Sequence, residues 1–507
     1  MGAGGSVPQT LTKDDAMRLC GDRWDSSRWE ELAVDGTMGR EQFLSLIGAA
    51  ETTNVTIEDV PSCPSPSTMD LSPLDLSCGG RSTPMLWWYR ETLDTGRLLA
   101  SLPAVLAHYP AFAGRYSPAL EGMGVPRSVV LSNKGVPVQV SESEQTFAEA
   151  SSFLRANDHD DAPTTYKSGT NASYFWYDRK VMDPDCGNPD APIMAVRVTS
   201  FKGGGSVIGL LLQHRVTDAE GEMTFMANWA SACRGEEGVE VVMGREAMLG
   251  LTGLSKEELE QAGAGGAMME TCAYPMKPPP FAALMPKMGA GPNMTSTRIP
   301  IAGEVVSSMK QSAAENLPEG KFVSTDDVMT ARAWKAFVKM RRQQLGDGVS
   351  GEDVTAVFRA VNIRTRATPP LPRGYVGNGA CTVRSGMTVA ELEESSVQKV
   401  ALLLREDLGK WNGDVVGGVL GWMGERQREG LRAGAQMKTG LDFICSSWLM
   451  PWETAVFETG KEVYAFDHGA LIPIVCNFAK RQGGGYTAWT TGGEADVQLF
   501  AQELVRM

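Results

Sequence analysis

Residues 211–230 read LLQHRVTDAEGEMTFMANWA, and this stretch decides the fold. A nearly continuous apolar run ends at His214, which is typical of a strand buried on both faces. From Asp218 onward apolar residues recur at helical spacing until Gly235. The stretch therefore predicts a buried strand, a short turn that begins at His214, and an amphipathic helix capped by Asp218.

The histidine in this turn is a candidate acid–base group. An imidazole titrates near neutrality, so it can take a proton from an alcohol or an amine at physiological pH. A His-x-x-x-Asp pair by itself favours a structural histidine, because such pairs arise readily by chance in 507 residues. Among the four histidines, however, only His214 combines a strand end with a following aspartate.

Outward from this stretch, strands and helices alternate in both halves of the chain, which predicts an α/β fold in two domains. Each domain is expected to have a mixed sheet flanked by helices. The expected helices cover 98–109, 218–234, 324–342, 388–410 and 493–506, and the expected strands cover 193–201, 206–213, 354–363, 470–476 and 486–491.

A chain of 507 residues exceeds what one hydrophobic core ordinarily supports. Residues 1–54 are expected to form a helical N-terminal extension whose EF-hand-like stretch, 31–42, has Ala33 and Gln42 at ligand positions and so holds no calcium. The other expected boundaries are 55–255 for the first domain, 256–300 for a Gly/Pro/Met-rich crossover and 301–507 for the second domain.

Composition excludes several classes of function. A net charge of −14 argues against a nucleic-acid binder with a broad basic surface, and no apolar run is long enough to span a bilayer. The nine cysteines are scattered without a C-x-x-C pair, so we expect no metal site and reduced thiols. With no apolar leader, a cytoplasmic protein is expected. The start Met1–Ser6 fits the pattern for myristoylation at Gly2, although one acyl chain gives only weak membrane attachment.

An ordered series of motifs resembles the BAHD acyltransferases, the plant-type CoA-dependent enzymes marked by H-x-x-x-D. His214 and Asp218 supply that motif. The other segments similar to the family are LSPLD (71–75), STPMLWWYR (82–90), LPAVLAHYPAFAGR (102–115), STDDVMTARAWKA (324–336), VNIRTRATPPLPRGYVGN (361–378) and SSWLMPWETAVFETGK (446–461).

The resemblance implies two chloramphenicol-acetyltransferase-like domains with the active-site channel between them. Acyl-CoA is then a co-substrate, no cofactor is bound permanently, and the acceptor is a small alcohol or amine. His214 is the general base of a direct attack that passes through a tetrahedral intermediate. Trp448 is the candidate donor to the oxyanion, with Ser446 as its partner. A monomer is expected.

The resemblance also assigns residues around the base. Asp218 is expected to turn away from the cavity and to pair with an arginine. Thr83, Met85 and Trp87 match positions that line the acceptor pocket, which hints at an apolar or aromatic acceptor, although core packing explains Met85 and Trp87 equally well. Ser324 and Thr325 are expected near the CoA entrance.

One motif departs from the family pattern. Its D-F-G-W-G element reads VFETG at 456–460 here, so the arginine that the lost aspartate would hold, Arg364 or Arg366, needs another partner. Glu453 and Glu458 are the candidates nearby in sequence. Two alternatives stay open: a lipid-type acyltransferase that makes wax esters or diacylglycerol derivatives, and a catalytically degenerate scaffold that binds CoA esters.

Overall fold

The structure is a computed structural model of the chain. It describes residues 10–14, 17, 29, 36–39, 51–56, 67–79, 82–119, 124–152, 154, 164–167, 190–273, 295–315, 317–437, 440–468, 475–481 and 484–506.

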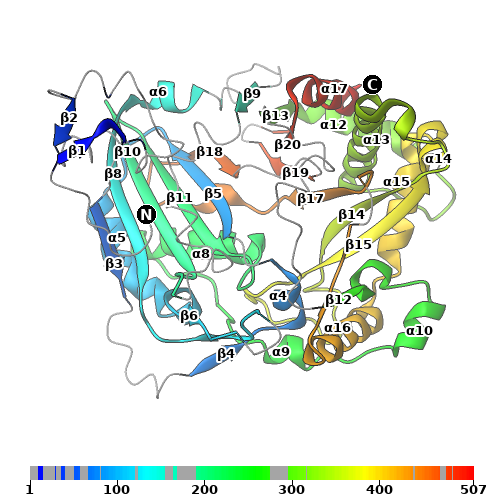
Figure 1. The fold of residues 1–507 in the computed structure, drawn as a ribbon, viewed down its shortest axis with the longest axis horizontal. Coiled ribbons are helices and arrows are strands. Elements are labelled where there is room, and N and C mark those ends of the chain that lie inside the picture. Colours follow the sequence, from blue (N-terminus) through cyan, green and yellow to red (C-terminus); the bar gives the residue numbers. More distant parts are fainter. Residues whose placement is uncertain are drawn as a thin grey trace.

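The first layer is a six-stranded sheet with the strand order β18-β5-β11-β10-β8-β3 (Figure 1). Its central strand, β11 (Ser206–Gln213), is buried at all eight positions, as its apolar run predicts. The neighbouring β10 (Met194–Lys202) and β5 (Ser82–Tyr89) both run antiparallel to it. The outer strands are β8 (Val136–Thr146), β3 (Glu51–Val55) and β18 (Val463–His468).

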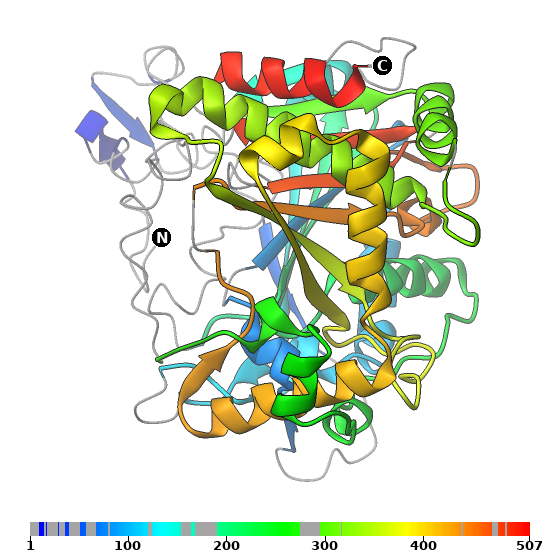
Figure 2. The same cartoon turned by 90° about the vertical axis from the view of Figure 1, so that its right-hand side faces the viewer.

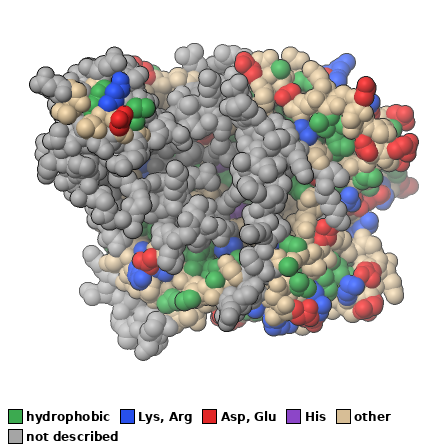
Figure 3. Space-filling model, in the orientation of Figure 1, with side chains coloured by type: hydrophobic (Ala, Val, Ile, Leu, Met, Phe, Trp, Pro, Cys, Tyr) green, Lys and Arg blue, Asp and Glu red, His purple; other side chains and the backbone are tan. Residues whose placement is uncertain are grey.

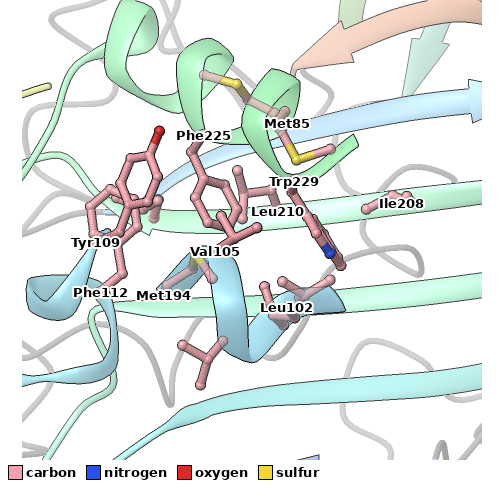
Figure 4. Packing of buried hydrophobic residues seen from close by; sticks show 14 of the residues in the cluster. Met85, Leu102, Val105, Tyr109, Phe112, Met194, Ile208, Leu210, Phe225 and Trp229 are labelled. Carbon is pink, nitrogen blue, oxygen red and sulfur yellow. The ribbon is translucent and has the colours of Figure 1, made fainter. Parts of the chain in front are cut away.

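Two helices, α5 (Thr95–Leu106) and α8 (Ala219–Arg234), cover one face of this sheet. Figure 4 shows Leu102 and Val105 of α5 and Phe225 and Trp229 of α8 packed with apolar side chains of the strands. Phe225 of α8 meets Tyr109 edge to face at 5.2 Å between ring centroids, and Trp229 lies 6.0 Å from Phe225. Such ring pairs add about 0.5–1.5 kcal/mol each beyond the area they bury, so α8 has a fixed position on the sheet.

The second layer is a seven-stranded sheet with the order β15-β14-β17-β19-β20-β13-β9. Helices pack over it in front of the strands (Figure 2), and α13 contacts both α15 and α17. The strands are β15 (Ala380–Thr388), β14 (Val354–Asn362), β17 (Phe443–Trp448), β19 (Val475–Lys480), β20 (Tyr486–Gly492), β13 (Thr295–Ile301) and β9 (Thr164–Lys167). The helices are α12 (Gly303–Ala314), α13 (Thr325–Leu345), α14 (Val389–Glu394), α15 (Val397–Gly409) and α17 (Glu494–Val505).

The two sheets exchange strands. β18 comes late in the chain but pairs with β5 of the first sheet. Conversely, β9 comes early but pairs with β13 of the second. Because each sheet completes its hydrogen bonding with a strand from the other half, the two layers are interlocked. The expected boundaries at 255 and 301 stay a prediction.

A third apolar cluster lies below the two sheets and is built around α16 (Gly413–Arg428). Part of the expected crossover belongs here, since α10 (Lys256–Gln261) contacts α16, and β12 (Thr271–Ala273) pairs with β16 (Leu431–Ala433). Residues 274–294 lie outside the described ranges. The remaining short elements are α4 (Pro73–Ser77), α6 (Phe147–Ala150), α9 (Glu246–Leu249), β4 (Thr68–Asp70), β6 (Arg115–Tyr116) and β7 (Ser128–Val130).

The described residues of the N-terminal extension include helical ones, at 13–14, 17 and 29, as well as strands, so its helical character stays a prediction. In its described part, β1 (Thr10–Thr12) pairs with β2 (Thr37–Gly39), and β3 joins the first sheet beside β8. The sequence does not predict a strand at 51–55, because apolar and polar residues do not alternate there. Most of the EF-hand-like stretch 31–42 lies outside the described residues.

The helix predictions hold apart from one break. Thr388 and Glu391 form the predicted capping box, but the helix ends at Glu394, and Ser396 caps a second one. Within the described residues, no helix is long and apolar enough to cross a membrane. On the face drawn in Figure 3, acidic and basic side chains of the described residues are interspersed over the second layer.

Candidate active site

His214 is the first residue after β11, and hydrogen bonds hold its backbone in a turn. The Val216 N–H donates to the Gln213 carbonyl at 2.8 Å, and the Asn378 side-chain amide donates to the His214 carbonyl at 2.8 Å. The imidazole itself is exposed, whereas Gln213 and Val216 are buried. The turn therefore presents one accessible base at the end of an otherwise buried strand.

A buried carboxylate organises the residues behind this turn. Asp75, in α4, accepts hydrogen bonds from the Asn378 side-chain amide at 2.7 Å and from the Arg245 Nε at 2.7 Å. Arg245 in turn donates to the carbonyl of Val216. One carboxylate thus connects both groups that bind the backbone around His214. Asp75 lies in the LSPLD motif, yet its role was not recognised from the sequence.

Two titratable side chains face the imidazole, and sequence reasoning missed both. Interaction with the Cys78 side chain, first through charge and then through a hydrogen bond, raises the pKa of His214 to about 10, and Glu222 contributes to the same rise. Burial raises the pKa of the Glu222 carboxyl well above its ordinary value, and the Thr83 side chain lies close to it. Neither residue belongs to H-x-x-x-D, so only tertiary contacts could find them.

Asp218 turns away from the imidazole, as expected, and pairs with Arg364. The two guanidinium nitrogens donate to its two carboxylate oxygens at 2.9 and 3.0 Å, and the Gly379 N–H adds a bond of 2.8 Å. Burial alone would raise the pKa of Asp218, but Arg364 and the N–H donors hold it below its ordinary value. Asp218 also caps α8 by accepting from the Gly221 N–H at 3.1 Å.

The other arginine and the proposed substitute carboxylates behave differently from expectation. Arg366 donates to the carbonyl of Trp411 at 3.3 Å and not to a carboxylate in any bond found among the described residues. Glu458 binds Lys461 at 2.7 Å and Glu453 is exposed, so neither replaces the lost aspartate as a partner of Arg364. Arg364 needs no substitute because Asp218 already binds it.

The altered VFETG segment still packs into the first layer. Phe457 is fully buried and meets Trp229 of α8 edge to face at 4.9 Å. Arg234, at the end of α8, donates to the carbonyl of Val456. The segment has thus lost its aspartate but keeps its contact with the helix that follows the motif.

Ser446 and Trp448 lie on the same face of β17 and hydrogen-bond to each other. The Trp448 indole N–H donates to the Ser446 hydroxyl oxygen at 3.0 Å. Because that indole proton is used, the serine hydroxyl is the group of the pair with a proton left to donate. The expected order of the two residues is therefore reversed: Ser446 is the direct donor candidate, and Trp448 orients it.

Trp448 rests on His468, whose ring lies 4.7 Å away between centroids. His468 is buried at the end of β18, and its Nε2 is 3.1 Å from the Asn477 amide. The strand β5 connects this pair of rings to the base. His468 of β18 pairs with Met85 of β5, and Ser82 of β5 pairs with Gln213, the residue before His214.

The expected acceptor-pocket residues divide into two kinds. Met85 and Trp87 have no exposed surface and pack in the core of the first layer, with Trp87 5.3 Å from Phe466. Core packing is therefore what the structure shows for these two, because alternate residues of β5 face the helices. Thr83 is half-buried and adjoins Glu222, so it alone of the three lies beside the base.

The expected CoA-contacting residues open α13. Ser324 is its N-cap, accepting from the Asp327 N–H at 3.2 Å while its hydroxyl donates to the Asp327 carboxylate at 2.8 Å. Thr325 is the first residue of the helix, and both side chains are half-buried. The capping role of Ser324 is clear from these bonds; contact with CoA stays a prediction.

An accessible imidazole at the end of a buried strand, in a sheet interlocked with a second one, is the arrangement expected of a CoA-dependent acyltransferase with a His-x-x-x-Asp motif. The profile of the Transferase family matches residues 52–504. The chain therefore belongs to this family, the BAHD acyltransferases, as a divergent member with an altered D-F-G-W-G element.

Two relatives show how far the sequence similarity extends. The hydroxycinnamoyl-CoA:piscidic acid hydroxycinnamoyltransferase of Actaea racemosa is 26% identical over 319 residues, which are 61% of this chain and 63% of that protein. Tryptamine hydroxycinnamoyltransferase 2 of Oryza sativa subsp. japonica is 26% identical over 316 residues, 61% of this chain and 62% of that protein. The chain thus spans just under two thirds of the length of these relatives.

A solved structure confirms the fold class. F. graminearum TRI101 in complex with coenzyme A and T-2 mycotoxin has a TM-score of 0.67 at 17% identity and covers 85% of this chain and 96% of its own. The predicted fold, two chloramphenicol-acetyltransferase-like domains with mixed sheets and flanking helices, is thereby confirmed.

Proposed function

We propose that this protein transfers an acyl group from an acyl-CoA thioester to a hydroxyl or amine of a small acceptor, with His214 as general base. The observation that carries the proposal is the position of His214: its ring is exposed while its backbone is bound by Asn378. Asp218, the other motif residue, is committed to Arg364 and leaves the imidazole free of that carboxylate.

The neutral imidazole of His214 takes a proton from the acceptor as the acceptor oxygen or nitrogen attacks the thioester carbonyl. Negative charge then develops on the carbonyl oxygen, where a fixed donor has its largest effect. The Ser446 hydroxyl, oriented by the Trp448 indole N–H, is the donor that we assign to this oxyanion. Collapse of the tetrahedral intermediate expels the CoA thiolate, which takes the proton from His214.

The residues around the base say more about the chemical class of the acceptor than the names of the relatives do. The relatives are named for piscidic acid and for tryptamine, so they support small organic acceptors without separating hydroxyl from amine. With Met85 and Trp87 buried in the core, the aromatic character that they suggested for the acceptor loses its support. Thr83 and Glu222 place polar groups beside the base.

The direct test is release of free CoA thiol. Purified full-length protein is incubated with acetyl-CoA or a hydroxycinnamoyl-CoA and a panel of alcohols and amines, and products are identified by mass spectrometry. The His214→Ala variant is expected to lose about two to four orders of magnitude in turnover, the usual contribution of acid–base catalysis. The matched control is His108→Ala, which changes an exposed histidine at the end of α5. Near wild-type turnover in the His214 variant would refute the assignment.

A catalytically inert CoA-ester scaffold is the competing function, and the packing of Phe457 weighs against it. The altered element that suggested degeneration keeps its contact with Trp229. A protein that binds acyl-CoA but releases no thiol with any acceptor would support the scaffold instead. For a lipid acceptor, lipid analysis of cells that overproduce the protein supplies the corresponding test.

A further inference from the structure

Cys78 is a nucleophile beside the proposed base that the direct-attack mechanism leaves unused. It follows α4 immediately, and its thiol hydrogen-bonds to the His214 imidazole. Its Sγ also donates to the Asn378 Oδ1 at 3.5 Å, while the amide nitrogen of the same Asn378 side chain donates to the His214 carbonyl at 2.8 Å. One asparagine therefore contacts both members of the pair.

The pair has the geometry that thiol-based acyl transfer requires. A thiolate is the reactive form of cysteine, and a base within hydrogen-bond reach generates it. The Cys78 side chain is half-buried and the His214 ring is exposed, so a ligand that reaches the base is close to the thiol as well.

We propose that Cys78 is an acylation site, at which the enzyme takes the acyl group from acyl-CoA onto its own sulfur. The inference rests on the proposed function, because acyl-CoA is the donor in both. His214 takes the Sγ proton, Sγ attacks the thioester carbonyl, and the bond between the carbonyl carbon and the CoA sulfur breaks. The CoA thiolate then takes the proton from His214, leaving an acyl-Cys78 thioester and free CoA.

This step needs no further reactant, since one thioester replaces another. The loaded enzyme can return its acyl group by the same chemistry: the acceptor attacks the Cys78 thioester, His214 takes the acceptor proton, and the Cys78 thiolate leaves and recovers that proton. Acylated Cys78 is thus a second route to the same product beside the direct attack.

The test is mass spectrometry of the intact full-length protein after incubation with acetyl-CoA or a hydroxycinnamoyl-CoA and no acceptor. We expect up to one acyl group per chain, located on the peptide that contains Cys78 and removed by neutral hydroxylamine, which cleaves thioesters. Cys78→Ala should abolish the adduct, and His214→Ala should lower its rate of formation by at least about tenfold, as loss of a general base does.

The matched control is Cys272→Ser, which removes a half-buried free thiol on β12 and should leave the adduct unchanged. Cys78→Ser keeps the size of the side chain, so loss of the thioester there cannot be attributed to misfolding when its melting temperature matches the wild type. Thiol release with an acceptor present is measured on the same preparations. Turnover without an adduct, or an adduct that persists in Cys78→Ala, overturns this inference alone; absence of both turnover and adduct overturns the proposed function as well.

Discussion

Arg364 binds the Asp218 carboxylate through two parallel hydrogen bonds of 2.9 and 3.0 Å, although the two residues lie 146 positions apart. The pair joins the turn that carries His214 to the strand-and-loop segment after β14. Both side chains are nearly buried, at 8% and 9% exposure. The aspartate of the motif is therefore a positioning residue that fixes where the imidazole lies.

Loss of this aspartate should destabilise the fold. Asp218→Ala leaves the buried Arg364 guanidinium with only the partly exposed Glu220 carboxylate at 3.4 Å, which costs up to about 3–5 kcal/mol in the free energy of unfolding. Denaturant or thermal unfolding measures the change. Glu144→Ala is the matched control, because its ion pair with Lys202 is 68–82% exposed and contributes at most about 1 kcal/mol. Equal unfolding energies for the two variants would show that the buried pair is not stabilising.

The pH dependence of activity should respond to Cys78. A base acts only when neutral, and Cys78 with Glu222 raises the pKa of His214 to about 10, so kcat/KM should rise up to about pH 10. Cys78→Ser removes the main cause of that rise, and the acid limb should move toward the ordinary histidine value of about 6.5. Profiles of kcat/KM from pH 5.5 to 10 test this. Superimposable profiles would mean that the thiol does not influence the base.

Ser446 and Trp448 should behave as one unit. Ser446→Ala removes the donor assigned to the oxyanion and is expected to lower kcat by about 10²–10³-fold with little change in KM. Trp448→Phe keeps a ring against His468 but loses the bond that orients the serine, so its loss should be smaller. In the double variant the two losses should not add, because the tryptophan acts through the serine. Fully additive losses would show that Trp448 contacts the reacting carbonyl itself.

Asn378 should affect turnover more than binding. Its side-chain amide holds the His214 carbonyl at 2.8 Å and also contacts Asp75 and Cys78. Asn378→Ala frees the turn, and a displacement of about 1 Å at a catalytic group can cost on the order of 10² in rate. Steady-state kinetics should show the loss in kcat with KM nearly unchanged. A comparable rise in KM with kcat preserved would place Asn378 in substrate binding instead.

Local patterns predict much of the fold because they record burial and capping directly. The apolar run 206–213 became β11, Asp218 and Gly235 delimit α8, and Thr388 and Glu391 form their capping box. The break between α14 and α15 was missed because Ser395 and Ser396 interrupt a pattern whose apolar spacing continues. The sequence predicts that Asp218 pairs with an arginine but does not say which one, and it assigns Arg364 and Arg366 to the lost aspartate instead.

The strand, the turn and the helix around His214 can be predicted from the sequence, because apolar periodicity and capping residues act over a few positions. Only the tertiary structure shows which groups surround His214. Cys78, Asn378 and Glu222 come from separate elements, and the folded chain brings them together. It also decided that Met85 and Trp87 belong to the core and that the Trp448 indole N–H binds the Ser446 hydroxyl. Burial and hydrogen-bond geometry depend on neighbours distant in sequence, and no local pattern records them.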